Sequence, residues 1–305
     1  MQQAQRKTTS RRELARNPRF EQVSPEVGEL DEAALDESMQ DDPDETLAML
    51  ADLTGATDVA LRDLARRLAG RLFLDISRRG PSRPRGVGKL VEQPYRPDGG
   101  DLDIDASLDA IVEAGGAGRQ RSVKVGQGVD VERLRVRGWA QPGTALCLLV
   151  DRSGSMGGKP LATSAVAAAA VAWRSPADYS VLAFGKDVVA AKSQDIAKSS
   201  ERVVTDVLAL RGFGTTDLAG ALLGAAEQLR RSRAGRKVTI LLSDCRATVD
   251  GDPFAAAAGL DELVIIAPEG DDAEASAFAL RTGARLTTVD GPSAVAEAIG
   301  RVLES

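Results

Sequence analysis

From residue 144 onward, short apolar runs alternate with segments whose apolar positions recur at helical spacing. This alternation predicts strands over 145–150, 179–184, 188–191, 237–243, 262–267 and 285–289, and helices over 159–173, 201–210, 218–230, 273–282 and 293–303. The run at 188–191 is short enough to be an edge strand. Continuously apolar strands separated by helices are typical of a mostly parallel sheet covered on both faces. The sequence therefore predicts a doubly wound, Rossmann-like α/β domain over 144–305.

The pattern before this domain is more polar and predicts a mainly helical, partly disordered region over 1–79. Residues 1–25 are polar and are expected to be disordered, and the acidic stretch 30–45 indicates a solvated helix or a flexible tether. A helix is predicted to start at Thr57-Asp58, because apolar residues recur behind it at helical spacing, namely Leu61, Leu64, Leu68, Leu72 and Ile76. Arginines flank this stripe. They indicate a solvated face or, alternatively, a docking surface for an acidic partner.

Residues 80–143 have the composition of a connecting segment with little regular structure. Prolines and glycines punctuate 80–100, which predicts a linker or an extended arm. A short helical pattern covers 104–112, and Leu134 and Val136 alternate with arginines in a predicted strand.

Composition narrows the functional classes. The chain has 305 residues, a net charge of −6, two cysteines and no histidine. The absence of histidine excludes Ser-His-Asp and Cys-His catalysis and any zinc site that needs imidazole. The negative charge gives no reason to expect nucleic-acid binding. Cys147 and Cys245 lie in or beside apolar runs and are expected to be small buried side chains. With a polar amino terminus and no apolar stretch of roughly 20 residues, we expect a cytoplasmic protein without a membrane span.

Oxygen-bearing side chains cluster at the ends of the predicted strands. Asp151-Arg-Ser153-Gly-Ser155 ends the first strand, Asp244 follows the strand in "VTILLSDC", and Thr215-Thr216-Asp217 precede a helix in "GFGTTDLAGAL". In such sheets ligands bind beyond the carboxyl ends of the strands. A hard cation such as Mg²⁺ takes oxygen ligands and retains waters, so it needs few carboxylates. An ion held mainly by hydroxyls and waters can accept one more anionic oxygen, which a partner's Asp or Glu would supply.

These motifs resemble the von Willebrand factor A (VWA) domain over roughly 144–305. The matching features are Asp-x-Ser-x-Ser at 151–155, Thr216 in a Gly-x-Thr-Asp-Leu setting, and Asp244 after an apolar strand. In that family these positions form the metal-ion-dependent adhesion site (MIDAS). The resemblance implies metal ligation by Ser153, Ser155 and Thr216, with direct or water-mediated contacts from Asp151 and Asp244. It implies Mg²⁺, with Mn²⁺ or Ca²⁺ as alternatives.

Two positions depart from the family pattern without removing a ligand. Thr215 stands where a second glycine is frequent, and Arg152 stands where an uncharged residue is frequent. Asp217 is expected to be a helix N-terminal acid rather than a sixth ligand.

The amino-terminal half resembles the region that precedes the A domain in bacterial cytoplasmic members, including the CoxE-like group. The residues concerned are "DLDIDASL" at 101–108 and "RLRVRGWAQPGTALCLLVD" at 133–151. Such proteins often act beside an AAA+ ATPase of the MoxR type that remodels or matures a target complex. The resemblance therefore implies a protein-binding subunit with such an ATPase as partner.

The same residues also allow other interpretations. A capped turn explains Asp151-Ser153-Ser155 alone, but not the match at Thr216 and Asp244. A haloacid-dehalogenase-type phosphatase needs a second acid where this chain has Ser153. "GSMGGKP" lacks the residues of a phosphate-binding loop, because Pro160 follows its lysine. An architectural subunit with an unoccupied metal site stays as an alternative. We expect that the chain is not an enzyme.

Overall fold

A computed structural model of the chain describes residues 8–17, 19–78, 89–95, 101–116, 134–140, 143–152, 157–210, 212 and 214–304. Its contacts divide the chain into two compact units. One contains Met1–Arg83 together with Thr144–Ser305, and the other contains Pro84–Gly143.

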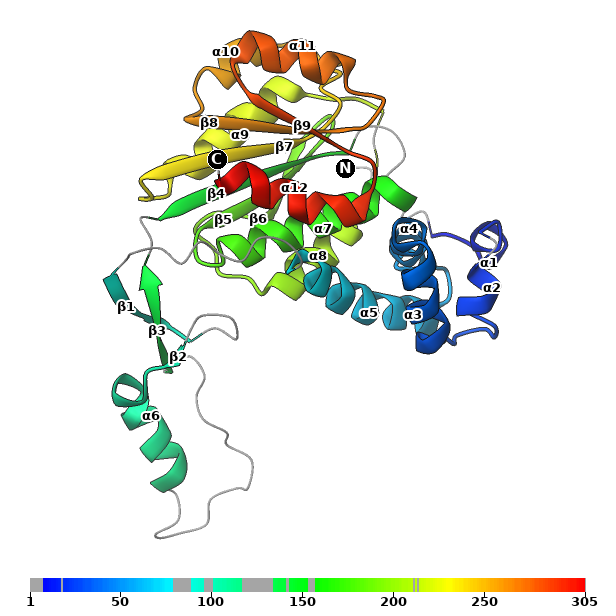
Figure 1. Cartoon of the computed structure of the whole chain (residues 1–305), viewed down its shortest axis with the longest axis horizontal. Coiled ribbons are helices and arrows are strands. Elements are labelled where there is room, and N and C mark those ends of the chain that lie inside the picture. Colours follow the sequence, from blue (N-terminus) through cyan, green and yellow to red (C-terminus); the bar gives the residue numbers. More distant parts are fainter. Residues whose placement is uncertain are drawn as a thin grey trace. The chain divides into compact units, whose positions relative to one another are not determined.

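The larger unit is built on a six-stranded sheet in the order β6-β5-β4-β7-β8-β9 (Figure 1). Its strands are β4 (Thr144–Asp151), β5 (Tyr179–Phe184), β6 (Val188–Lys192), β7 (Arg236–Leu242), β8 (Glu262–Pro268) and β9 (Arg285–Val289). All neighbours are parallel except β6, which pairs antiparallel with β5 at the edge. The predicted doubly wound α/β fold, with its edge strand, is confirmed.

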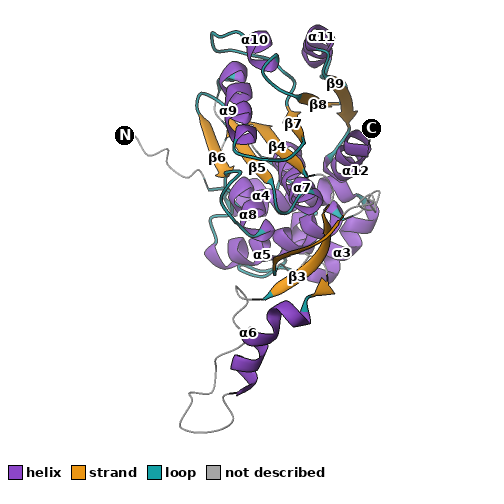
Figure 2. Cartoon of the chain, turned by 90° about the vertical axis from the view of Figure 1, so that its left-hand side faces the viewer, coloured by secondary structure: helices purple, strands orange, loops and turns teal. Residues whose placement is uncertain are grey.

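Two helical layers cover this sheet, and alternate side chains of β4 divide between them. Leu146, Leu148 and Val150 join the core under one layer, and Ala145, Cys147 and Leu149 join the core under the other. Figure 2 shows α9 on the opposite side of the sheet from α7 and α12. The helices are α7 (Gly158–Arg174), α8 (Ser200–Leu208), α9 (Leu218–Arg230), α10 (Pro253–Ala257), α11 (Ala273–Thr282) and α12 (Pro292–Glu304). Only α10 was not predicted, because five residues are too few to show a period.

Among the described residues before the smaller unit there are five helices: α1 (Arg11–Leu14), α2 (Phe20–Val23), α3 (Glu32–Asp41), α4 (Pro43–Leu53) and α5 (Val59–Ser77). The predicted helical region is confirmed, but the expectation of disorder over residues 1–25 is wrong for the described residues 8–17 and 19–25. Phe20, Val23 and Leu35 are fully buried. Arg11 stacks on the Phe20 ring and donates hydrogen bonds to backbone oxygens of the 24–26 turn. A few apolar anchors and one arginine therefore order a segment that is mostly polar.

Helices α4 and α5 pack directly on α7, which is buried almost all round. Helix α5 begins after Asp58, whose side chain accepts hydrogen bonds from two backbone amides of the first turn, as predicted. Its buried face differs from the predicted leucine stripe, because the alanines between the leucines lie innermost. The buried residues of α5 are Leu61, Ala65, Ala69, Gly70, Phe73, Ile76 and Ser77. Small side chains let α5 approach the alanine-rich α7 closely, so the leucines Leu64, Leu68 and Leu72 lie at the margin.

The smaller unit contains a three-stranded antiparallel sheet in the order β1-β3-β2, with α6 (Ile104–Gly116). The strands are β1 (Lys89–Pro94), β2 (Asp101–Leu102) and β3 (Arg135–Ala140). The predicted helix and arginine-bearing strand are confirmed, whereas the stretch predicted as a linker contains β1. Asp103, 3% exposed, accepts from the amide of Ala106 and pairs with Arg137 at 2.6 Å, which joins α6 to β3. Within the described residues of the whole chain, no helix is both long and apolar enough to cross a bilayer.

Candidate metal centre

The sheet reverses its strand order between β4 and β7. From β4 the chain proceeds outward to β5 and β6, then returns to β7 on the other side of β4 and continues to β8 and β9. Asp151 ends β4, and Ser243 and Asp244 directly follow β7. Because the two strands are parallel neighbours, these residues emerge at the same edge of the sheet. This is the crevice in which doubly wound sheets bind their ligands.

The two acids at this edge are held by neighbouring polar groups. The Ser243 hydroxyl donates to Asp151 Oδ2 at 2.6 Å and accepts from the amide of Cys245 at 2.9 Å. Asp244 Oδ1 accepts from the amide of Arg246 at 3.0 Å, and its Oδ2 lies 3.5 Å from Arg246 Nη1. Arg246 also pairs with Asp271, so its guanidinium is shared between acids of two loops. Both predicted carboxylates are therefore oriented by fixed partners.

Thr216 belongs to the loop that enters α9 and is 1% exposed. Its amide donates to Thr248 Oγ1 at 2.7 Å, and its carbonyl accepts from the amide of Thr248 at 3.0 Å. This paired contact joins the loop before α9 to the loop after β7, which also carries Asp244. Asp217 caps α9, since its Oδ1 accepts from the amide of Gly220 at 2.8 Å. The expectation of a helix N-terminal acid at Asp217 is confirmed.

Arg152 links the loop after β4 to the turn between β5 and β6. Its amide donates to the carbonyl of Phe184 at 2.7 Å, and its Nη2 donates to the carbonyl of Asp187 at 3.2 Å. The side chain is buried, and this burial lowers the pKa of the guanidinium while the Asp187 carboxylate opposes the shift. The position that departs from the family pattern thus has a structural role.

These contacts close a ring of hydrogen bonds around the sheet edge. Asp151 is joined to the loop after β7, and that loop is joined through Thr248 to the segment before α9. The amide of Asp217 donates to the carbonyl of Gly185 at 2.8 Å, and the β5–β6 turn is joined through Arg152 back to the end of β4. Four loops from distant parts of the chain therefore hold one another in place.

Cys245 has a left-handed backbone, with a φ of 65°, which is uncommon for a residue with a side chain. Such conformations cost on the order of 1–3 kcal/mol and cluster at functional sites. Burial first, and then the nearby charges of Asp244 and Asp151, raise the pKa of the Cys245 thiol to about 12. Cys147 is fully buried, and burial raises its pKa to about 12 as well. Both thiols are therefore protonated at neutral pH, which agrees with the predicted role of buried apolar side chains.

The donor set at this edge suits a hard cation that is bound partly by hydroxyls. Among the described residues, no three or more acids or cysteines gather closely enough to hold a metal by themselves. Asp151 and Asp244 bring two carboxylates, and Thr216 brings a hydroxyl to the same set of joined loops. Ser153 and Ser155 lie outside the described residues. Carboxylate, hydroxyl and water oxygens are the ligands that Mg²⁺ accepts, so the residues present fit such an ion.

Several residues of this edge were not predicted from the sequence. Ser243 stands directly before Asp244 in "LLSDC", and a hydroxyl beside a predicted ligand is a signal that could have identified it. Arg246 and Thr248 follow in the same loop but match no spacing rule. Asp52 also reaches this region from α4, where its Oδ1 accepts from the amide of Gly158 at 2.7 Å. Nothing in the sequence signals a contact between residues 106 positions apart.

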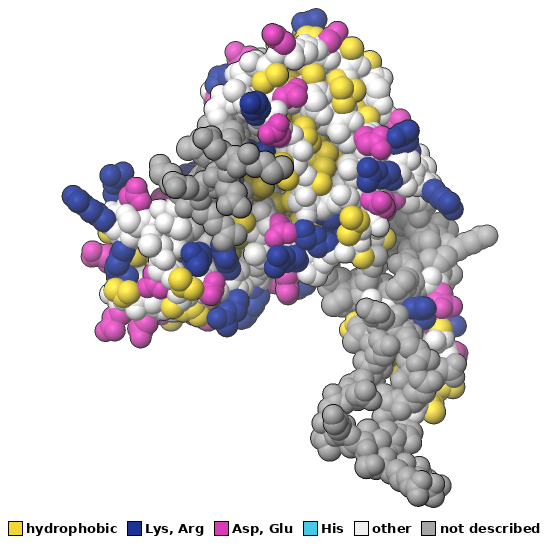
Figure 3. Space-filling model, turned by 180° about the vertical axis from the view of Figure 1, so that it is seen from behind, with side chains coloured by type: hydrophobic (Ala, Val, Ile, Leu, Met, Phe, Trp, Pro, Cys, Tyr) yellow, Lys and Arg dark blue, Asp and Glu magenta, His cyan; other side chains and the backbone are white. Residues whose placement is uncertain are grey.

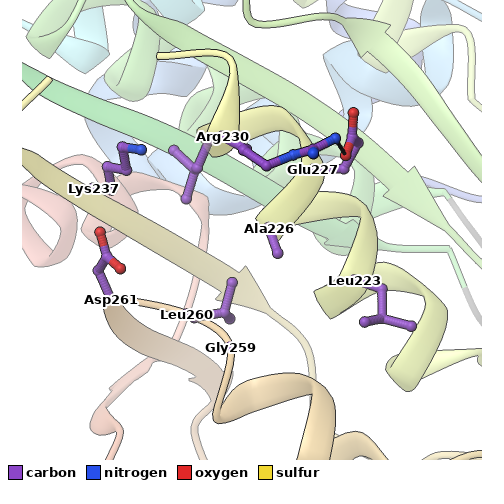
Figure 4. Close-up of a pocket in the computed structure, with 9 residues that line it drawn as sticks. Leu223, Ala226, Glu227, Arg230, Lys237, Gly259, Leu260 and Asp261 are labelled. Carbon is purple, nitrogen blue, oxygen red and sulfur yellow. Dashed lines mark hydrogen bonds and ion pairs between the residues drawn. The ribbon is translucent and has the colours of Figure 1, made fainter. Parts of the chain in front are cut away.

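Two hollows lie on the face that carries α9. One, of about 500 Å³, adjoins Asp217 between the starts of α9 and α10 and is lined mainly by small and apolar residues with Asp250 and Asp252. The other, of about 350 Å³, lies between the carboxyl half of α9 and residues 259–261, and Lys237 and Asp261 face it (Figure 4). Because Lys237 and Asp261 stand at the beginnings of β7 and β8, this second hollow is at the edge opposite the predicted metal ligands. Only the first hollow borders the candidate site.

Figure 3 shows hydrophobic side chains gathered between charged ones on the face seen from behind. In the larger unit, the exposed large hydrophobic residues among those described include Val188 and Val189 on β6 and Leu223 on α9. Leu223 lines both hollows, so they adjoin at this exposed apolar side chain.

Similar folds occur among solved structures. A von Willebrand factor type A protein from Catenulispora acidiphila is 15% identical, with a TM-score of 0.40, and the match covers 55% of this chain and 43% of that one. A manganese-loaded TRAP protein from Plasmodium vivax is 20% identical, with a TM-score of 0.41, over 51% of this chain and 71% of that one. Proximal thread matrix protein 1 from the mussel byssus, solved with a zinc-occupied MIDAS motif, is 14% identical, with a TM-score of 0.40, over 53% and 47%.

The sequence comparisons give the family. No curated protein matches the chain. Residues 79–266 match the profile of the family described as "VWA domain containing CoxE-like protein", which is more than half of the chain. The matched range includes the ends of β4 and β7 and the segment before α9. The chain therefore belongs to the family of VWA-domain-containing CoxE-like proteins.

Proposed function

We propose that this protein is a divalent-metal-dependent protein-binding subunit. The proposed ligands are Asp151, Ser153, Ser155, Thr216 and Asp244, and the proposed ion is Mg²⁺, with Mn²⁺ and Ca²⁺ as alternatives. The single observation that carries the proposal is the ring of hydrogen bonds at the sheet edge where β4 and β7 end. It joins Asp151, the loop of Asp244 and the loop of Thr216 by direct hydrogen bonds. A preorganised set of oxygen ligands is what a hard cation needs.

The proposed mode of binding follows from the charge of the ligands. A divalent cation supplies positive charge at the sheet edge, and two carboxylates with neutral hydroxyls leave room for one more anionic oxygen. A carboxylate of a partner protein completes the set. Ser243 keeps Asp151 turned toward the edge, and Arg246 holds Asp244 from the side of the α11 loop. The partner's Asp or Glu is then recognised by charge and geometry together.

The residues at the edge favour binding over catalysis. The sequence contains no histidine, so the commonest general base is absent. The thiol nearest to the site, Cys245, has its pKa raised to about 12 and is not a nucleophile at neutral pH. We therefore propose that the chain is not an enzyme. A metal-dependent phosphohydrolase of the haloacid-dehalogenase type is disfavoured because residue 153 is serine rather than an acid.

The cellular location, the partner and the domain organisation are proposed from the family resemblance. We propose that the protein acts in the cytoplasm with a MoxR-type AAA+ ATPase, in the remodelling or maturation of a target complex. The proposed organisation is an amino-terminal helical region over 1–79, a connecting segment over 80–143 and the VWA domain over 144–305. The amino-terminal region provides a second docking surface in this scheme, and the arginines of α5 (Arg62, Arg66, Arg67 and Arg71) are its candidates.

A capture experiment tests this function. The tagged full chain is incubated with an extract of the native cells in Mg²⁺ or in excess EDTA, and retained proteins are identified by mass spectrometry. Asp151→Ala and Asp244→Ala are expected to abolish the Mg²⁺-dependent capture, and Thr216→Ala to weaken it less, because a water can replace one neutral hydroxyl. Asp250→Ala is the matched control, since Asp250 is an exposed acid in the same loop as Asp244.

Capture that survives both aspartate variants and the chelator would contradict the mechanism. It would favour the alternative, an architectural subunit whose metal site is unoccupied.

A further inference from the structure

Strand β6 forms one edge of the six-stranded sheet, and its amino-terminal half is exposed (Figure 2). Residues 186–190 are all exposed, whereas Ala191 and Lys192, at 8% and 5%, are buried. Val188 and Val189 are 36% and 45% exposed although both are large apolar side chains. An exposed apolar edge strand is a template to which another chain can add a strand.

Hydrogen bonds on the inner side of β5 show which backbone groups of β6 face outward. The amide of Arg152, directly after β4, donates to the carbonyl of Phe184 at 2.7 Å, so Phe184 faces β4. Because successive residues of a strand turn their backbone groups to opposite sides, Ala183 faces β6. Ala183 lies opposite Val189, so these two residues exchange the hydrogen bonds between the strands. The amides and carbonyls of the residues on either side of Val189 therefore point away from the sheet.

These outward groups belong to Val188 and Ala190. Among the hydrogen bonds between described residues, none joins their amides or carbonyls to another part of the chain. The other half of β6 is protected, because the register shifts there and Lys198 Nζ donates to the carbonyl of Ala191. A bulge and a lysine at the edge are means by which proteins prevent strand addition. This protection leaves a short receptive edge at 186–190.

The two exposed valines of this receptive edge stand on opposite faces of the sheet. Val188 lies opposite Phe184 on the α9 face, where a Cβ at Gly224 of α9 would lie 3.4 Å from its Cγ1. Val189 lies opposite Ala183 and belongs to the other face. An added strand therefore finds an apolar neighbour on each face, which favours a segment rich in β-branched side chains.

The length and charge of the receptive edge favour an extended segment of another protein over a second copy of this chain. Five strand residues span about 16 Å. Two rigid copies would pair over this length only, whereas a stable interface buries roughly 1,200 Å² or more. In a symmetric antiparallel pair centred on Val189, Lys186 of one copy would also stand opposite Lys192 of the other, which is unfavourable. A flexible segment pairs over the same length and continues across the neighbouring surface.

The receptive edge begins beside the proposed metal centre. The carbonyl of Asp187 accepts from Arg152 Nη2, and the carbonyl of Gly185 accepts from the amide of Asp217, so the β5–β6 turn belongs to the ring of hydrogen bonds at that edge of the sheet. Strand β6 runs away from the metal edge, since it is antiparallel to β5. A strand added antiparallel to β6 runs toward the metal edge. It would lie three strand spacings from β4, about 14 Å, which four or five extended residues bridge.

We propose that the exposed half of β6 is a strand-docking site for the partner that the metal site captures. The partner segment is extended and rich in β-branched residues, and it adds antiparallel to β6 over 186–190. Its Asp or Glu follows four or five residues later, on the carboxyl-terminal side, and reaches the cation. The role of the acid rests on the proposed function, whereas the strand pairing itself needs no metal.

The experiment uses the full chain and the fluorescein-labelled peptide Thr-Val-Thr-Val-Thr-Gly-Ser-Gly-Ser-Asp. Fluorescence anisotropy measures its affinity in Mg²⁺, and NMR hydrogen exchange locates its binding site. In the chain alone, the amides of Val188 and Ala190 should exchange fast and that of Val189 slowly. Saturating peptide should slow exchange at Val188 and Ala190. A peptide that is N-methylated throughout its Thr-Val-Thr-Val-Thr part should bind at least tenfold more weakly, because it has no amide to donate.

A pair of variants at Ala190 tests the same edge from the side of the protein. Ala190→Pro removes an amide that faces outward, so the bonds between β5 and β6 stay and the edge strand tolerates the proline. It should weaken peptide binding about tenfold. Ala190→Ser is the matched control, because it keeps the amide and should bind as the wild type does.

The outcomes separate the strand docking from the metal site. The proposal is overturned if the peptide does not bind, if it binds without slowing exchange at Val188 and Ala190, or if Ala190→Pro binds it as tightly as the wild type. A chain that is dimeric and already protects these two amides would also overturn it, since the occupant would be a second copy. Exchange that is slowed at both amides, with an affinity that EDTA leaves unchanged, would support the strand docking and refute the proposed metal function instead.

Discussion

Leu50→Ala tests whether the amino-terminal helices and the VWA sheet unfold as one unit. Leu50 lies on α4, is fully buried and belongs to the same core cluster as the α7-facing side chains of β4. Removing a buried leucine side chain costs about 2–5 kcal/mol, from lost transfer free energy and from the cavity left behind. Because Leu50 is completely buried, we use a value inside this range, about 3 kcal/mol.

This free energy translates into a measurable shift of the melting temperature. For a unit of about 150–250 residues, each 1 kcal/mol lowers the midpoint by about 2–4 °C. The variant should therefore melt about 6–12 °C below the wild type, in one transition, when circular dichroism at 222 nm is followed on heating. Urea unfolding should show a lower midpoint with an unchanged slope, because the buried surface is the same.

Leu223→Ala is the control, because the same side chain on α9 is 60% exposed. It should change the free energy of unfolding by less than about 0.5 kcal/mol. The reasoning fails if Leu50→Ala produces two transitions and the larger one keeps the wild-type midpoint. That result would mean that the helices before residue 83 unfold independently of the sheet.

Three further predictions concern the edge of the sheet that carries the proposed ligands and the opposite edge, where the strands begin. Ser243→Ala removes the donor to Asp151, a hydrogen bond to a charged group of about 1.5–3 kcal/mol, and should weaken Mn²⁺ binding at least tenfold in a calorimetric titration. Mn²⁺ at about 100 times its dissociation constant should add about 2.7 kcal/mol to the free energy of unfolding, and EDTA should remove this gain. Glu262 accepts hydrogen bonds from Arg236 at 2.7 Å and from Arg285 at 3.0 Å. These contacts, the Arg236 hydrogen bond above all, lower the pKa of Glu262 below its ordinary value of 4.5. Its ionised form thus stabilises the fold above pH 4.5, and this contribution is lost as pH falls through the lowered pKa. Glu262→Gln should cost about 1 kcal/mol at pH 7 and flatten the pH dependence of urea unfolding below pH 4.5.

The sequence predicted the sheet domain closely because its signals are local. Apolar runs such as "YSVLAF" at 179–184 need no distant partner to be recognised as buried strands, and the observed bounds of β5 agree with the prediction. The alternation of strands and helices was sufficient to predict a mostly parallel sheet with helices on both faces, though not the order of its strands. In the structure β4 and β7 are parallel neighbours, which brings Asp151 and Asp244 to one edge. The assignment of these residues as metal ligands stays a prediction.

The remaining features depend on contacts between distant residues. The described residues 8–17 and 19–25 are mostly polar, yet they form regular structure because Phe20 and Val23 fit a core formed by residues far along the chain. The buried face of α5 follows its alanines rather than its leucines, since the close approach of α7 decides which side chains lie innermost. Asp52 could not be found from local pattern, because an acid near a helix end is common and its partner is the backbone amide of Gly158.

The most direct test of the account is a Mn²⁺ titration of the full chain, followed by electron paramagnetic resonance, with the wild type and three variants side by side. We predict one tightly bound ion per chain for the wild type and for Asp250→Ala, and none for Asp151→Ala or Asp244→Ala. Bound Mn²⁺ that persists in both ligand variants, or a wild type that binds none, would contradict the claim that this sheet edge is a metal centre.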